Sequence, residues 1–135
     1  MKRILFTVSV MIAFVLLLTS CGTSSKLPEG FTEEEVKEQT IQDIELACEE
    51  GFEAWKSRFQ KALQPSLTED SYNSFLAVLK EKGAFKEYGK CAFVGQEQDG
   101  KKYAACIMIV EYEEGSIQYT VGYDENMDLV QFVVK

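Results

Sequence analysis

Histidine is absent from this chain, and its absence excludes many catalytic centres. The 135 residues contain no histidine, two prolines and one tryptophan. Imidazole is the commonest metal ligand and the usual general base near neutral pH, so sites built on it are excluded. The sequence carries no other catalytic signature. We therefore expect no cofactor and no metal centre, and we lean towards a protein that is not an enzyme.

Basic residues are also scarce. The chain has 14 basic and 22 acidic residues, which gives a formal net charge of −8. A negative charge of this size repels the phosphates of nucleic acids and the head groups of anionic lipids. We therefore expect neither nucleic acid nor a membrane surface to be held by electrostatic attraction.

The one long apolar run of the sequence stands at its beginning. Lys2 and Arg3 precede the apolar residues 4–18, and Thr19-Ser20-Cys21 follow. The run is too short to span a bilayer comfortably, and its charged start and small-residue end are typical of a signal peptide. A cysteine at this junction indicates a bacterial lipoprotein. Residues 1–20 are thus the expected signal peptide, and Cys21 the lipidated first residue of the mature chain.

This prediction places the protein on the extracytoplasmic side of the bacterial cell membrane, held by lipid. Cleavage before Cys21 leaves 115 of the 135 residues, with 12 basic against 22 acidic side chains and a formal charge of −10. The small and polar residues 21–31 are expected to form a tether. Residues 32–135 are enough for one domain with a modest core.

Three cysteines lie beyond the lipidation site: Cys48, Cys91 and Cys106. Their number is odd and their spacing fits no metal knuckle. We expect buried free thiols. The alternative, which an oxidising compartment permits, is a disulfide that joins Cys48 to Cys91 or to Cys106.

Two helices are predicted in the first half of the domain. Thr32 and Glu35 have the spacing of a capping box, and the apolar residues that follow recur every three or four positions up to Pro65. Gly51 interrupts this pattern and is expected to bend or break the helix. A second helix is predicted from Ser66, its expected cap, to Gly83.

From about residue 88 the apolar residues alternate, which predicts strands. Turns are expected at Asp99-Gly100, Glu114-Gly115 and Glu125-Asn126. These turns predict the pairs Cys91–Met108, Phe93–Cys106, Tyr119–Val110, Val121–Met108, Val130–Val121 and Phe132–Tyr119.

In this register one sheet face is entirely apolar or aromatic. It collects Cys91, Phe93, Cys106, Met108, Val110, Ile117, Tyr119, Val121, Val130, Phe132 and Val134. The predicted fold is therefore α+β, with two N-terminal helices packed on one face of a curved four-stranded antiparallel meander. The outer face is more apolar than a fully solvent-exposed sheet face needs to be. Its expected contact surface centres on Ile107, Ile109, Leu129 and Val133.

Two segments carry a family resemblance: residues 79–85, which read LKEKGAF, and residues 127–132, which read MDLVQF. With the order of helices and strands, they resemble the bacterial exported proteins that contain the domain of unknown function 3887, over residues 33–135. That family is similar to the nuclear-transport-factor-2-like and cystatin-like cones. The resemblance implies helices packed on a curved sheet, and it implies no catalytic residues.

Two polar motifs are better explained as turns. Residues 95–102 nearly match a phosphate-binding loop but lack its final hydroxyl residue and the helix that must follow. Asp124, Asn126 and Asp128 begin like a calcium loop, but Leu129 stands where glycine is needed. We expect a charged hairpin tip and an acidic turn.

The sequence leaves two functions open. The first is a non-catalytic, lipid-anchored binding or accessory module for a protein partner, a second copy of itself or a small ligand. The alternative is a small cone-fold enzyme, isomerase-like or hydrolase-like, with an acid–base pocket. The alternative requires a buried carboxylate beside a tyrosine, and the sequence indicates no such carboxylate on the inner face.

Overall fold

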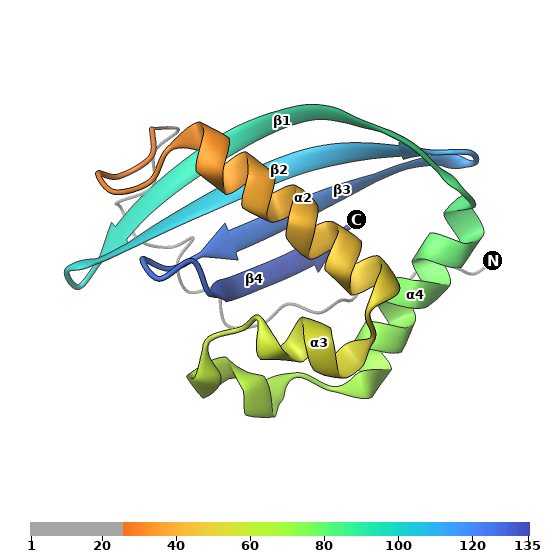
Figure 1. The fold of residues 1–135 in the computed structure, drawn as a ribbon, viewed down its shortest axis with the longest axis horizontal. Helices are drawn as coiled ribbons and strands as arrows, with labels where there is room; N and C mark the ends of the chain where they lie inside the picture. The colour runs from red at the N-terminus through yellow and green to blue at the C-terminus, as the bar shows by residue number, and fades with distance from the viewer. Residues whose placement is uncertain (1–25) are drawn as a thin grey trace.

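The computed structural model describes residues 26–135 as helices followed by a four-stranded antiparallel sheet. The helices all lie on one side of the sheet, which curves around the longest of them (Figure 1). Within these residues, no helix is long and apolar enough to cross a membrane. The predicted signal peptide and Cys21 lie outside the described residues. The elements are α2 (Glu33–Glu49), α3 (Phe52–Ser57), the 3-10 helix η2 (Lys61–Ser66), α4 (Glu69–Lys82), β1 (Phe85–Gln98), β2 (Lys101–Tyr112), β3 (Gly115–Tyr123) and β4 (Leu129–Val134).

Helix α2 begins as the sequence predicts. The Thr32 hydroxyl accepts a hydrogen bond from the backbone N–H of Glu35 at 3.1 Å. The break expected at Gly51 is confirmed: Gly51 takes a positive φ of 99° and separates α2 from the short helix α3. A second break follows α3, where the backbone of Arg58 and Gln60 forms hydrogen bonds with that of Leu129. The predicted single helix is therefore three elements.

Helix α4 has a different cap from the predicted one. Thr68, rather than Ser66, accepts the hydrogen bond from the backbone N–H of Ser71, at 3.1 Å. Ser66 belongs to η2, and its hydroxyl donates to the carbonyl of Leu63. Gly83 ends α4 with a φ of 82°, as the sequence predicts.

The strands follow the predicted order, and their side-chain faces are mostly as predicted. The β1–β2 register is confirmed, with Cys91 opposite Met108. The β2–β3 register is displaced by two residues, so Tyr119 pairs with Met108 rather than with Val110. In β4, Phe132 pairs with Val121 rather than with Tyr119. Because side chains alternate along a strand, a shift of two residues changes the partner and keeps the face.

A bulge at the start of β4 overturns the predicted faces of two residues. Gly122 pairs with Gln131, but the next residue, Tyr123, pairs with Leu129, so Val130 is an extra residue. Leu129 is therefore fully buried in the inner core, at 0% exposure, and does not belong to the outer surface where the sequence placed it. Val130 instead packs separately, against Leu63 and Tyr103.

The core lies between the helices and the inner face of the sheet. Aromatic rings join the two layers: Trp55 of α3 lies 5.8 Å from Phe132, and Phe75 of α4 lies 6.1 Å from Tyr119, both centroid to centroid. Leu27 and Phe31, which the sequence assigned to a tether, also pack against this core. The domain therefore begins before residue 32.

Candidate functional site

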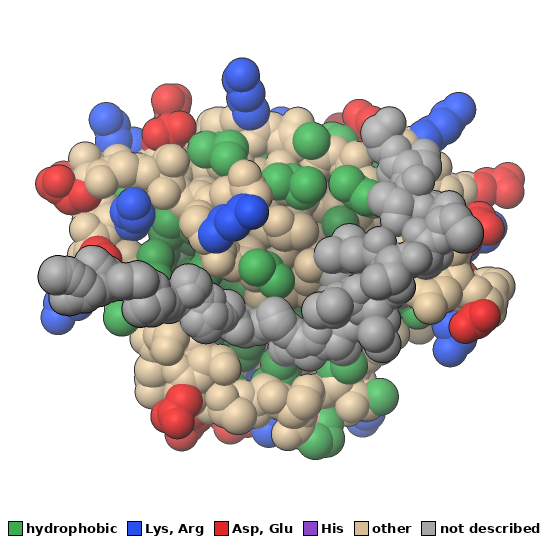
Figure 2. All heavy atoms as spheres, turned by 180° about the vertical axis from the view of Figure 1, so that it is seen from behind, with side chains coloured by type: hydrophobic (Ala, Val, Ile, Leu, Met, Phe, Trp, Pro, Cys, Tyr) green, Lys and Arg blue, Asp and Glu red, His purple; other side chains and the backbone are tan. Residues whose placement is uncertain are grey.

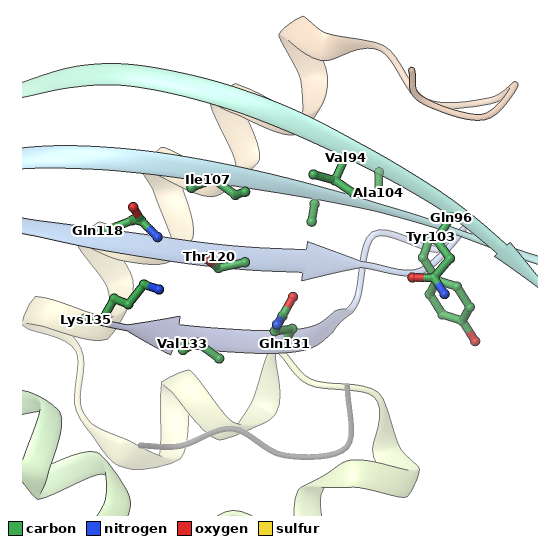
Figure 3. A pocket seen from close by; sticks show the side chains of 11 residues that line it. Val94, Gln96, Tyr103, Ala104, Ile107, Gln118, Thr120, Gln131, Val133 and Lys135 are labelled. Carbon is green, nitrogen blue, oxygen red and sulfur yellow. The ribbon is translucent and has the colours of Figure 1, made fainter. Parts of the chain in front are cut away.

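The outer face of the sheet carries a hollow of about 320 Å³, to which all four strands contribute (Figure 3). Figure 2 shows the molecule from the side opposite α2, where apolar side chains gather around this region. Two of the predicted surface residues, Ile107 and Val133, line it. We call this region the outer-face hollow; it is lined by Val94, Gln96, Tyr103, Ala104, Ala105, Ile107, Gln118, Thr120, Gln131, Val133 and Lys135.

The other two predicted residues lie elsewhere. Ile109 is half-buried in β2, two residues after Ile107, and does not line the hollow. Leu129 faces the inner core because of the β4 bulge. The structure thus brings together half of the predicted surface.

The outer-face hollow also contains a buried amide that the sequence did not single out. Gln131 is only 9% exposed, and among the described residues its side-chain oxygen has no hydrogen-bond partner. A buried carbonyl that accepts no hydrogen bond lowers the stability of the folded protein by about 1–3 kcal/mol. Lys135 is the one charged residue among those that line the hollow. The lining therefore suits an uncharged group that offers a hydrogen-bond donor.

A buried carboxylate is present after all, on the helix side of the sheet. Asp43 of α2 is 1% exposed, and it accepts hydrogen bonds from Arg58 at 2.6 and 3.0 Å. It also accepts a hydrogen bond of 2.6 Å from the hydroxyl of Tyr123. The hydrogen bond with Asp43 is the main cause that raises the pKa of Arg58.

The sequence did carry a signal for this residue. Asp43 follows Val36 by seven positions and precedes Ala47 by four, so it belongs to the buried stripe of α2. Its position in the stripe does not by itself predict burial, because a carboxylate is rarely buried without a partner. That partner, Arg58, is fifteen residues away in the sequence. The pair joins α2 to the end of α3 and does not line the outer-face hollow, which indicates a structural role.

A second hollow of about 270 Å³ lies between α2, the end of α4 and the paired strands β1 and β2. It is on the opposite side of the sheet from the outer-face hollow. Its lining is apolar and acidic, and three of its ten residues are aromatic. We call it the helix-side pocket; it is lined by Ile44, Glu45, Cys48, Glu49, Leu79, Gly83, Phe85, Tyr88, Val110 and Tyr112.

The three cysteines of the described domain are free thiols, as expected, but Cys106 alone of the three is fully buried, whereas Cys48 and Cys91 are half-buried. Burial raises the pKa of Cys48 to about 11 and that of Cys106 to about 12. The thiolate is the nucleophile, so a thiol with a raised pKa is a weak one at neutral pH. Cys48, which lines the helix-side pocket, is therefore not an activated catalytic cysteine.

The polar motifs are the expected turns. Residues 95–102 form the end of β1, a turn and the start of β2. In the acidic turn, the Asp124 carboxylate accepts hydrogen bonds from the backbone N–H groups of Asn126 and Asp128, at 2.8 and 3.0 Å. In the part of the chain that the structure describes, no group of three or more candidate ligands is placed to hold a metal ion.

Comparisons with other proteins agree with this architecture. Residues 29–132 match the family described as "Protein of unknown function (DUF3887)". An NMR structure of a protein from Ruminococcus gnavus ATCC 29149 is 51% identical in sequence, with a TM-score of 0.77. The match covers 82% of this chain and 97% of that chain. None of the curated proteins compared with the chain is similar to it.

Proposed function

Because the chain belongs to the DUF3887 family, whose description assigns no function, we propose that it is a lipid-anchored, extracytoplasmic binding module. The outer-face hollow is the proposed contact site. The observation that carries this proposal is a partly apolar hollow in which the buried side-chain oxygen of Gln131 accepts no hydrogen bond from residues 26–135.

The anchor is proposed from the sequence. The basic start, the apolar residues 4–18 and the small residues before Cys21 have the order of a lipoprotein signal. The exported part is strongly acidic, so anionic lipid would repel its surface, and a covalent lipid supplies the attachment instead. We also propose a likeness to the nuclear-transport-factor-2-like and cystatin-like cones, because the sheet curves around α2 (Figure 1).

The proposed occupant of the outer-face hollow is a protein partner that inserts an apolar side chain. Ile107, Thr120 and Val133 come from three neighbouring strands and supply a mostly uncharged floor (Figure 3). The Gln131 oxygen is itself buried, so a backbone or amide N–H of the partner would satisfy it after the side chain turns towards the hollow. This hydrogen bond removes the penalty of burying the oxygen unpaired. Apolar burial and one hydrogen bond thus act at the same place.

Site-specific photocrosslinking in the native envelope tests this proposal. A photoreactive residue at Thr120 should give one discrete adduct, because Thr120 lies within the hollow. The control position is Glu81, which is exposed on α4 on the other side of the sheet. The variant Ile107→Asp should abolish the adduct. An adduct of twice the chain's mass would identify a second copy as the partner, whereas equal labelling at both positions would refute the proposal.

The alternative of a small acid–base enzyme has less support. Its buried carboxylate, Asp43, is bound by Arg58 through two hydrogen bonds and lines neither hollow. The thiol of Cys48 has its pKa raised to about 11, which leaves it protonated near neutral pH. Neither group is placed to transfer a proton to or from a bound substrate.

A further inference from the structure

The helix-side pocket has features that the proposed contact on the outer face does not explain. It is enclosed by the last turns of α2 and α4 and by the paired strands β1 and β2, and it has a volume of about 270 Å³. Its floor is apolar, with Ile44, Leu79 and Val110. Because the sheet separates it from the outer-face hollow, a ligand here would leave the outer contact free.

Aromatic rings form one wall of this pocket. The centroid of Phe85 lies 4.9 Å from that of Tyr88, with the two rings tilted by 53°, and 6.3 Å from that of Tyr112, with the two rings edge to face at 80°. Phe85 is 52% exposed, and in the described part of the chain it is the one large apolar side chain left so open to water. Ring faces at an open mouth attract cations through their quadrupoles.

Carboxylates of α2 line the pocket beside these rings. Glu45 and Glu49 lie one turn apart on α2, so they share a face, and both line the pocket. They stand near the C-terminus of a helix whose last turn has no basic residue, where negative charge is disfavoured by the helix dipole. A third carboxylate, that of Glu113, accepts a hydrogen bond from the backbone N–H of Ala84 at 3.2 Å, beside the pocket residue Gly83.

The neighbouring groups do not neutralise this charge. None of the residues that line the pocket is basic. The Tyr88 hydroxyl donates a hydrogen bond of 3.0 Å to the Glu45 carboxylate, and burial together with this bond raises the pKa of Tyr88. Lys82, which precedes Gly83, has its ammonium group against Gly115 of the β2–β3 hairpin.

We propose that the helix-side pocket binds an organic cation, an amine or quaternary ammonium group on a small apolar body. The ammonium group lies between the carboxylates of Glu45 and Glu49 and the rings of Phe85 and Tyr88. The apolar body contacts Leu79 and Val110 below them. This combination of an aromatic wall and two carboxylates at the pocket mouth selects against neutral and anionic ligands of the same shape.

The test uses choline and dimethylbutanol, a neutral probe of the same shape in which carbon replaces the nitrogen. The full chain, purified in an uncharged maltoside detergent, is labelled at its methyl groups and titrated by NMR. Choline should shift the signals of Ile44, Leu79 and Val110 saturably. Dimethylbutanol should bind at least about tenfold more weakly, since the cation–π contacts and the carboxylates act only on the charged probe.

Variants assign the effect to the pocket. Glu45→Gln keeps an acceptor for Tyr88 and should weaken choline about tenfold at moderate salt. Glu38→Gln is the matched control, because Glu38 is exposed on α2 outside the pocket, and it should change the affinity less than about twofold. Phe85→Leu, at an exposed position, should also weaken choline.

Equal affinity for the two probes would overturn the inference and leave a general apolar pocket. Absence of any shift with choline would overturn it as well. Either result would leave the proposed contact on the outer face standing, because photocrosslinking at Thr120 tests that contact independently.

Discussion

Removal of the Asp43 carboxylate should destabilise the fold more than any change at the surface. Asp43 accepts hydrogen bonds from Arg58 at 2.6 and 3.0 Å, from Tyr123 at 2.6 Å and from Gln39 at 3.2 Å. Asp43→Ala leaves the buried hydroxyl of Tyr123 without its acceptor and the half-buried guanidinium of Arg58 without its closest carboxylate, so that Arg58 keeps the Met127 carbonyl at 2.8 Å as an acceptor. Loss of one partner of a buried ion pair costs about 3–5 kcal/mol. That is a large part of the roughly 5–15 kcal/mol that stabilises a typical domain.

The measurement is urea unfolding followed by the fluorescence of Trp55, the one tryptophan of the chain, which is 2% exposed. Glu38→Ala, an exposed change on the same helix, is the control and should alter the free energy of unfolding by less than about 0.5 kcal/mol. Asp43→Leu combined with Arg58→Met should recover part of the loss, because neither charge is then left unpaired. An effect of Asp43→Ala within about 1 kcal/mol of wild type would refute this reasoning.

Three further predictions concern lipidation, packing and pH. Cys21→Ser should abolish incorporation of an alkyne-labelled fatty acid in the bacterium and release the chain from the membrane; labelling that persists would contradict the anchor. Leu129→Ala should lower the free energy of unfolding by about 2–5 kcal/mol, and the half-buried Ile109→Ala by less; equal losses would contradict the bulge. The pKa of Cys48 is raised on folding from 9.0 to about 11, so its stabilising contribution is complete below pH 9 and is lost between pH 9 and 11. Thermal unfolding across this range should show a shallower decline for Cys48→Ala than for wild type, and identical slopes would refute it.

The inner face of the sheet was predictable because it depends on the alternation of side chains rather than on exact pairing. The β2–β3 hairpin turns at Glu113–Glu114, one residue before the predicted Glu114–Gly115. Moving the centre of a turn by one residue moves the register by two, so Tyr119 faces the core in both cases.

The β4 bulge could not be read from the sequence. Leu129 and Val130 are adjacent apolar residues, and either one fits a buried position. The choice is made by the chain that follows α3: Leu129 exchanges backbone hydrogen bonds of 2.9 and 3.0 Å with Arg58 and Gln60. These residues lie about seventy positions away, beyond the reach of any local pattern.

The sequence predicted only part of the candidate site, because the rest also lies beyond the reach of a local pattern. Ile107 and Val133 follow the strand alternation and line the outer-face hollow, whereas Gln131 was overlooked because glutamine on an outer face is expected to be solvated. The helix-side pocket brings residues of α2, α4 and the first two strands together. No single segment of the sequence carries that arrangement.

The outer-face contact is tested most directly by carbene footprinting of the chain in intact envelopes and after purification. Ile107 and Val133 are half-buried and line the hollow, so both should be labelled in the purified protein and protected in the envelope. Leu76, half-buried on α4 on the helix side, serves as the reference and should be labelled equally in both samples. Protection confined to Ile107 and Val133 is the predicted result. Equal labelling of these two residues in envelope and purified samples would contradict the claim that this face holds a partner.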